Sequence, residues 1–170
     1  MLANPKEKAK KAKKAKEIQS ELELERLNRT DESITHEHYE RLRANTPTDS
    51  IREMVNKKEK VDPVYGYKVD KLEADHIVSM KTITEMKDFS RLSTENQLKG
   101  LNNPDNFMGL GKSSNASKQD KSWAEWEGLR KEKVPEKLKA EMIEKEKGIG
   151  SLLENQIQTL LKTQRETIGE

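Results

Sequence analysis

Two segments, LEADHIVSM (residues 72–80) and NPDNFMGLGKSSNASK (residues 103–118), decide the fold expected for this 170-residue chain. The first contains a short apolar run with β-branched residues, which favours an extended strand. This strand would carry Asp75 and His76 side by side in sequence, with their side chains leaving it on opposite sides.

The second segment begins with a turn and then holds a short apolar run at 107–110 that suits a second strand. Asn106 opens this run. A loop at 111–114 follows, and we expect a helix from Asn115 onward that carries two tryptophans, Trp123 and Trp126, as core residues. The order strand, strand, helix predicts a compact ββα unit.

Composition limits how far a core can extend along the chain. Hydrophobic residues make up 31% of the sequence, charged residues 38% and aromatic residues 4%. So polar a chain favours a small packed centre flanked by solvated helices. We therefore predict an α+β fold, mostly helical, with a charged helical region at 1–60, the ββα core at 61–125 and a helical region at 126–170.

Several classes of protein are excluded or disfavoured by what the sequence lacks. There are no cysteines, so disulfides, thiolate zinc sites and cysteine nucleophiles are excluded. No apolar stretch approaches the roughly 18–20 residues of a membrane span. The net charge of +2 is too small to indicate a nucleic-acid binder, and its positive surplus lies in the N-terminal region.

The flanking regions carry weaker signals. Asn4 followed by Pro5 predicts a helix start, and the lysine-rich run after it is interpreted as a solvated helix or linker, with DNA-backbone contact as the alternative. VYGYKV (64–69) alternates as a strand would. The segment 148–150 suggests a hinge before a last amphipathic helix, whose apolar face packs either on the core or on a partner.

The residues of the two segments suit phosphodiester hydrolysis, which needs a base for water, a Lewis acid and charge stabilisation on phosphate. His76 is neutral near pH 7 and can accept a proton from water, and Asn106 would hold its ring through its side chain or carbonyl. Asp75 and Asn115 offer a carboxylate and an amide oxygen, which favour Mg²⁺ or a similar divalent ion. Lys118, one turn beyond Asn115, would meet a substrate phosphate.

This pattern resembles the HNH, or endonuclease VII-like, superfamily with its ββα-metal fold. More narrowly, it is similar to a toxin-associated branch that has an Asp-His pair, two asparagines and a lysine. The resemblance covers residues 61–125 and rests on the positions Asp75, His76, Asn106, Asn115 and Lys118.

The resemblance implies an endonuclease that uses Mg²⁺, Mn²⁺ or another divalent metal and cleaves DNA with little sequence specificity. In the family, Asp75 and Asn115 would be metal ligands, His76 the general base and Asn106 the residue that orients it. It also implies a toxin domain of a longer bacterial protein, secreted or delivered into the cytoplasm of a target cell and inhibited by a cognate immunity protein.

The sequence departs from the commonest HNH pattern and leaves alternatives open. Asn115 replaces the usual final histidine, and the long gap after His76 leaves Asn103 as a rival to Asn106. Glu73 is a further candidate ligand. The competing functions are the same nuclease acting on RNA, and a helical nucleic-acid-binding or scaffold protein without catalysis. The oligomeric state stays open.

Overall fold

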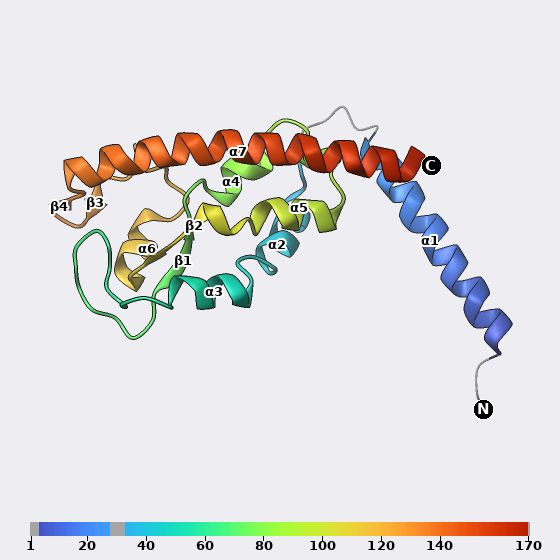
Figure 1. The fold of residues 1–170 in the computed structure, drawn as a ribbon, viewed down its shortest axis with the longest axis horizontal. Helices are drawn as coiled ribbons and strands as arrows, with labels where there is room; N and C mark the ends of the chain where they lie inside the picture. The colour runs from blue at the N-terminus through green and yellow to red at the C-terminus, as the bar shows by residue number, and fades with distance from the viewer. Residues whose placement is uncertain (1–3, 28–32, 170) are drawn as a thin grey trace.

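The structure is a computed structural model that describes residues 4–27 and 33–169. Over these residues the chain is α+β and mostly helical, as predicted, and it contains two small antiparallel sheets (Figure 1). The second sheet, at 128–133, lies in the region 126–170 that was predicted to be helical. The elements are α1 (Pro5–Leu27), α2 (His36–Arg43), α3 (Asp49–Val55), β1 (Glu73–His76), α4 (Met80–Thr84), η1 (Phe89–Arg91), α5 (Thr94–Leu101), η2 (Pro104–Asn106), β2 (Phe107–Leu110), α6 (Lys112–Lys118), β3 (Gly128–Leu129), β4 (Glu132–Lys133) and α7 (Glu136–Gly169). None of the described helices is long and apolar enough to span a membrane.

The two predicted strands pair with one another. β1 runs antiparallel to β2, with Asp75 opposite Met108 and His76 opposite Phe107. The chain between them forms α4, η1, α5 and η2, and α6 follows β2 directly. The predicted strand, strand and helix order is therefore present, with a helical excursion between the strands.

The start of α6 differs from the prediction. The helix begins at Lys112, not at Asn115, and ends at Lys118 before the two tryptophans. The reason is a brace from a distant loop: Asp62 Oδ1 accepts the Gly111 N–H at 2.9 Å, and the Tyr67 hydroxyl accepts the Ser114 N–H at 3.1 Å. These contacts satisfy amide groups at the helix start that a local cap would otherwise serve.

The predicted strand at 64–69 is wrong for the same reason. This stretch is a loop whose only ladder contact is an isolated bridge between Val61 and Lys68. Asp62 Oδ2 accepts the Tyr65 N–H at 2.8 Å and so holds the loop in a tight turn. Its two tyrosines bind different elements: the Tyr67 hydroxyl contacts Ser114 in α6, and the Tyr65 hydroxyl donates to the Glu132 carbonyl and accepts the Leu129 N–H.

The predicted hinge at 148–150 is also wrong. α7 continues through this segment as one helix of 34 residues, and in Figure 1 it lies along one side of the molecule. Its apolar face is buried, including Leu153 and Ile157. The amide of Gln164 adds a polar anchor, since its Oε1 accepts the Ser93 N–H at the start of α5 at 2.8 Å. The helix therefore packs on the core of its own chain.

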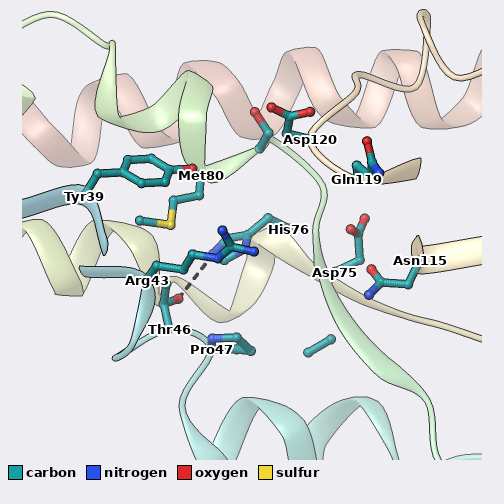
Figure 2. A pocket seen from close by; sticks show the side chains of 12 residues that line it. Tyr39, Arg43, Thr46, Pro47, Asp75, His76, Met80, Asn115, Gln119 and Asp120 are labelled. Carbon is teal, nitrogen blue, oxygen red and sulfur yellow. Dashed lines mark hydrogen bonds between the residues drawn. The ribbon is translucent and has the colours of Figure 1, made fainter. Parts of the chain in front are cut away.

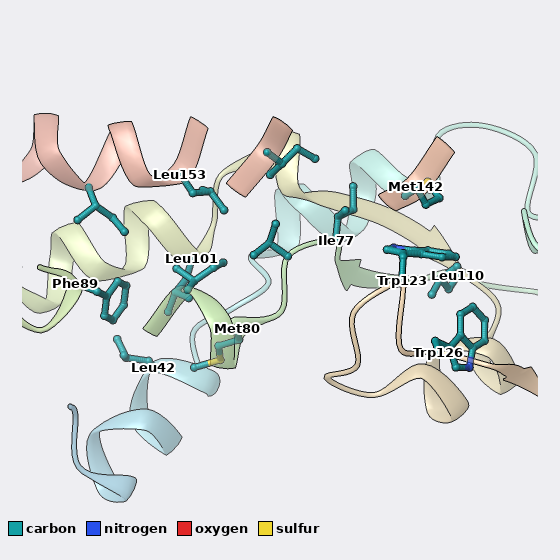
Figure 3. Close-up of a cluster of buried hydrophobic side chains, with 14 of the residues drawn as sticks. Leu42, Ile77, Met80, Phe89, Leu101, Leu110, Trp123, Trp126, Met142 and Leu153 are labelled. Carbon is teal, nitrogen blue, oxygen red and sulfur yellow. The ribbon is translucent and has the colours of Figure 1, made fainter. Parts of the chain in front are cut away.

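The hydrophobic core lies between α7, the helices that connect β1 to β2, and residues 119–127, which carry both tryptophans and which we call the tryptophan turn (Figure 3). Trp123 and Trp126 are buried with an edge-to-face contact at 5.5 Å between ring centroids, which confirms the prediction that both are core residues. Since aromatic rings bury large apolar areas, these two residues contribute a large share of the apolar area that the segment after α6 buries in the core.

The close approach at the start of α6 predicts the effect of adding one methyl group. In Gly111→Ala the new Cβ would overlap the Tyr67 ring and hydroxyl, whereas in Gly148→Ala it would meet nothing within 4 Å. We expect Gly111→Ala to lower the free energy of unfolding by about 1–3 kcal/mol. Gly148→Ala should raise it by about 0.5–1 kcal/mol, because alanine is the better helix former. Urea unfolding followed by circular dichroism measures both, and equal effects would contradict the brace.

Candidate active site

One open cavity of about 560 Å³ brings together three of the predicted site residues, Asp75, His76 and Asn115. Figure 2 shows the Asp75 carboxylate and the Asn115 amide on the same side of this cavity. Two predicted residues, Asn106 and Lys118, do not line it. The remaining lining residues are Tyr39, Arg43, Thr46, Pro47, Ala74, Ser79, Met80, Gln119 and Asp120.

The His76 ring is held at one nitrogen. Its Nε2 lies 2.9 Å from the carbonyl oxygen of Leu101, and Thr46 Oγ1 lies 3.3 Å from Nε2. A carbonyl can only accept, so Nε2 must carry the proton and Nδ1 of the neutral ring is the basic nitrogen. Nδ1 forms no hydrogen bond within the described part of the chain. The cross-strand ring of Phe107, with centroids 4.3 Å apart, packs against the imidazole.

Burial keeps His76 neutral. It lowers the pKa of His76 from its ordinary 6.5 to about 4, with the Leu101 hydrogen bond opposing this effect and the Lys118 charge adding to it. The imidazole is therefore uncharged at neutral pH, as a proton acceptor must be.

Asn106 does not hold the His76 ring as predicted. Its side chain is fully buried and forms two hydrogen bonds with the backbone of Val78, accepting from the N–H at 2.7 Å and donating to the carbonyl at 2.9 Å. Its own carbonyl accepts the Ile77 N–H at 2.8 Å. Asn106 thus fixes the chain just after His76, and the ring itself is oriented by Leu101.

Neither alternative from the sequence replaces these residues. The rival Asn103 caps η2 by accepting the Asp105 N–H and donates to Gln156 at 2.9 Å. Neither of these hydrogen bonds involves His76. Glu73, the further candidate ligand, does not line the cavity.

Lys118 also has a different position from the one predicted. Its Nζ lies 3.1 Å from Asp75 Oδ2, and both side chains are buried, with 0% and 7% of their areas exposed. The ammonium also lies 5.4 Å from the centroid of the Trp123 ring. The prediction that it meets a substrate phosphate fails here because the lysine points into the core, toward Asp75.

Burial and the ion pair act in opposite directions on the charge state of Asp75. Burial raises the pKa of this carboxyl from 3.8 to about 6, while the positive charge of the neighbouring Lys118 opposes the rise. Asp75 Oδ2 and Lys118 Nζ are both buried and form an ion pair, and neither atom forms a hydrogen bond within the described part of the chain. Asp75 is ionised at neutral pH and titrates close to it.

The donor chemistry at this end of the cavity fits a hard divalent cation. Asp75 and Asn115 both line the cavity and provide a carboxylate and an amide oxygen. Mg²⁺ is commonly held by one or two carboxylates while it keeps several waters. The described residues contain no group of three or more His, Asp or Glu side chains that could enclose a metal alone. A cation here would need water or substrate oxygens as further ligands.

Several cavity residues were missed at the level of sequence. Arg43 comes from α2 and Asp120 follows the left-handed residue Gln119, whose φ is 51°. The Leu101 carbonyl is contributed by the end of α5. A histidine and its carbonyl partner 25 residues apart leave no local pattern, so only the fold could have paired them.

Comparisons with protein-family models, with curated proteins and with solved structures find no match to this chain.

The buried ion pair predicts a strong effect of Lys118→Met. An unpaired buried carboxylate costs about 3–5 kcal/mol, so the variant should be destabilised by that amount near neutral pH. The penalty should shrink toward pH 4, where Asp75 is protonated with or without its partner. Urea unfolding at several pH values measures it. Lys112→Met, at an exposed position of the same helix, should change stability by less than about 0.5 kcal/mol at every pH.

The lowered pKa of His76 predicts a second pH dependence. The unfolded chain binds a proton at this residue between about pH 6.5 and 4 and the folded chain does not, so stability from His76 is present above 6.5 and lost as pH falls to 4. The difference in unfolding free energy between wild type and His76→Gln should therefore fall by about 2–3 kcal/mol over this range. His36→Gln, at an exposed position, should show no such trend.

Proposed function

We propose that this chain is a metal-dependent endonuclease that hydrolyses phosphodiester bonds of DNA with little sequence specificity. One observation carries the proposal: a neutral histidine with a free basic nitrogen, a carboxylate and an amide share one open cavity. These are the groups that a one-metal phosphodiesterase needs, and they are brought together from β1 and α6.

His76 is the general base in this proposal. A water molecule in the cavity attacks the phosphorus, its proton passes to Nδ1, and the bond from phosphorus to the departing oxygen breaks. The departing oxygen then takes a proton from solvent. The Leu101 carbonyl fixes the ring throughout, since it binds the opposite nitrogen. A bound phosphodiester anion would also raise the pKa of His76 and make it a stronger base.

Asp75 and Asn115 would hold the divalent metal. When bound, Mg²⁺ or Mn²⁺ supplies Lewis-acid stabilisation of charge on the phosphate and the departing oxygen. Asp75 binds best when ionised, which its pKa of about 6 permits at neutral pH. Lys118 helps to keep the carboxylate ionised and in position.

Arg43 takes the phosphate-binding role first assigned to Lys118. It is the one Lys or Arg among the residues that line the cavity, and its guanidinium suits two phosphate oxygens at once. Its ion pair with Glu40 is long, at 3.9 Å, and exposed, so little is lost when Arg43 turns to a substrate.

The cavity chemistry acts on the phosphodiester backbone, which DNA and RNA share, so RNA is the second candidate substrate. A toxin role, delivery into a target cell and inhibition by an immunity protein stay predictions that follow from the family resemblance.

The test is incubation of supercoiled plasmid with the protein in the presence of Mg²⁺, Mn²⁺ or EDTA. Wild type should nick or degrade the plasmid only with metal. His76→Ala should lose at least about 100-fold in rate, because general-base catalysis contributes roughly 10²–10⁴-fold.

The matched control is His36→Ala, which removes an exposed histidine outside the cavity and should cleave like wild type. Circular dichroism of His76→Ala establishes that it is folded. A folded His76→Ala protein with near-normal turnover would refute the assignment of the base. Intact plasmid together with cleaved RNA would change the substrate and keep the site.

A further inference from the structure

The N-terminal half of α1 concentrates positive charge that the cavity does not use. Between Pro5 and Lys16 it holds seven lysines and one acidic residue, Glu7. All of these side chains are exposed, and no ion pair within the described residues involves any of the lysines. The seven are Lys6, Lys8, Lys10, Lys11, Lys13, Lys14 and Lys16.

The geometry of the helix places this charge on every side. At 3.6 residues per turn the seven positions are spread around the whole circumference, so no face is left for packing. In Figure 1 this half of α1 points away from the body of the molecule, while α1 as a whole contacts α7 and η1. We call residues 5–16 the lysine arm.

The positive charges of the lysine arm destabilise its helical conformation. Lysines three or four positions apart repel one another, and Lys6 and Lys8 lie near the helix N-terminus, where the helix dipole disfavours cations. Alanine and lysine have high helix propensity, which offsets the repulsion. A polyanion beside the arm would remove both unfavourable terms, so its binding and the helical conformation favour each other.

We propose that the lysine arm binds the phosphate backbone of nucleic acid. A membrane surface is the less suitable polyanion, because helices that lie on lipid bury a face of large apolar side chains. The only apolar side chains between Lys6 and Lys16 are alanines, all exposed. Lysines contact phosphates without reading bases, so this binding has no sequence preference.

In Figure 1 α1 lies away from β1 and α6, the elements that carry the cavity residues Asp75, His76 and Asn115. A nucleic acid long enough to reach both is therefore held at a second point while its backbone is cleaved, and a short substrate is not. The arm thus raises affinity for long substrates. This contribution to cleavage rests on the proposed endonuclease, whereas the binding itself does not.

The first experiment measures binding without catalysis. The whole chain, in EDTA, is titrated into a fluorescein-labelled duplex of about 20 base pairs over roughly 50 to 300 mM KCl, with anisotropy as the readout. The variant has Lys10→Gln, Lys11→Gln, Lys13→Gln and Lys14→Gln together. The control carries the same charge change on exposed positions of α7, with Lys137→Gln, Lys145→Gln, Lys147→Gln and Lys162→Gln.

We expect the arm variant to bind about tenfold or more weakly at the lowest salt. The slope of log affinity against log salt should become shallower by about 2–4, since each phosphate contact contributes about 0.9. The control should keep most of the wild-type slope. Equal losses in both variants would show a net-charge effect and overturn the proposal, as would an unchanged slope in the arm variant. Tighter, arm-dependent binding to phosphatidylserine vesicles than to DNA would replace it with a lipid site.

A second readout separates this proposal from the endonuclease. Hydrolysis of bis(p-nitrophenyl) phosphate needs the cavity and no backbone, so the arm variant should match wild type there and show a raised KM on plasmid alone. A chain that hydrolyses neither substrate but keeps arm-dependent DNA binding would refute the endonuclease and support the arm.

Discussion

The ion pair between Asp75 and Lys118 is the interaction on which the site depends. It joins β1 to the last residue of α6, with 0% of the Lys118 side chain and 7% of the Asp75 side chain exposed, and the Trp123 ring lies beside the ammonium. Two opposite charges can stay buried only if they remain together, so strand, helix and tryptophan turn fix one another's positions. The backbone N–H of Trp123 in turn donates to Glu146 Oε1 at 3.2 Å, which connects this group to α7.

This constraint divides the roles of the charged residues. Lys118 is paired with Asp75, so it holds a carboxylate in place and does not line the cavity. Arg43, from α2, is left as the cation that faces the cavity. The helices before β1 are therefore part of the site, although the pattern that suggested a nuclease begins only at residue 61. Thr46, which follows α2, also belongs to the site, because its hydroxyl contacts both His76 and the Leu101 carbonyl that orients the imidazole.

In the function we propose, the charged groups that take part in hydrolysis are separate from the lysines that bind nucleic acid. The cavity lining combines a neutral imidazole, the carboxylates of Asp75 and Asp120 and the guanidinium of Arg43, and it lacks a cluster of positive charge. The lysine arm carries the positive surplus noted in the sequence. A separation of this kind lets affinity for a polyanion vary without disturbing the pKa of groups in the cavity, because exposed charges beyond about 10 Å are screened at 0.1 M salt.

Local features were predictable from local sequence. The caps at Thr35, Thr48 and Ser93 each accept an N–H three residues later, at 3.1, 3.4 and 3.2 Å. Asn4 likewise accepts the Lys6 N–H at 3.0 Å. The strands carrying Asp75 and His76 and following Asn106 were also found, because strand propensity and turn residues act over a few positions.

Features set by distant contacts were not predictable in the same way. The start of α6 moved three residues because Tyr67 serves as its cap, and the glycines of α7 stay helical because neighbouring apolar side chains pack on the core. From its spacing to Asn115, Lys118 was predicted to meet a phosphate. Only the fold shows that it pairs with Asp75.

By itself, the sequence determined the helical and α+β character of this protein, the two strands that carry or follow the site residues and the candidate groups Asp75, His76 and Asn115. The tertiary structure alone decided that Leu101 orients the histidine, that Asn106 holds the backbone beyond it and that Lys118 is buried. The physical reason is range: propensity and capping act within one turn, whereas burial and ion pairing depend on which residues the folded chain brings together.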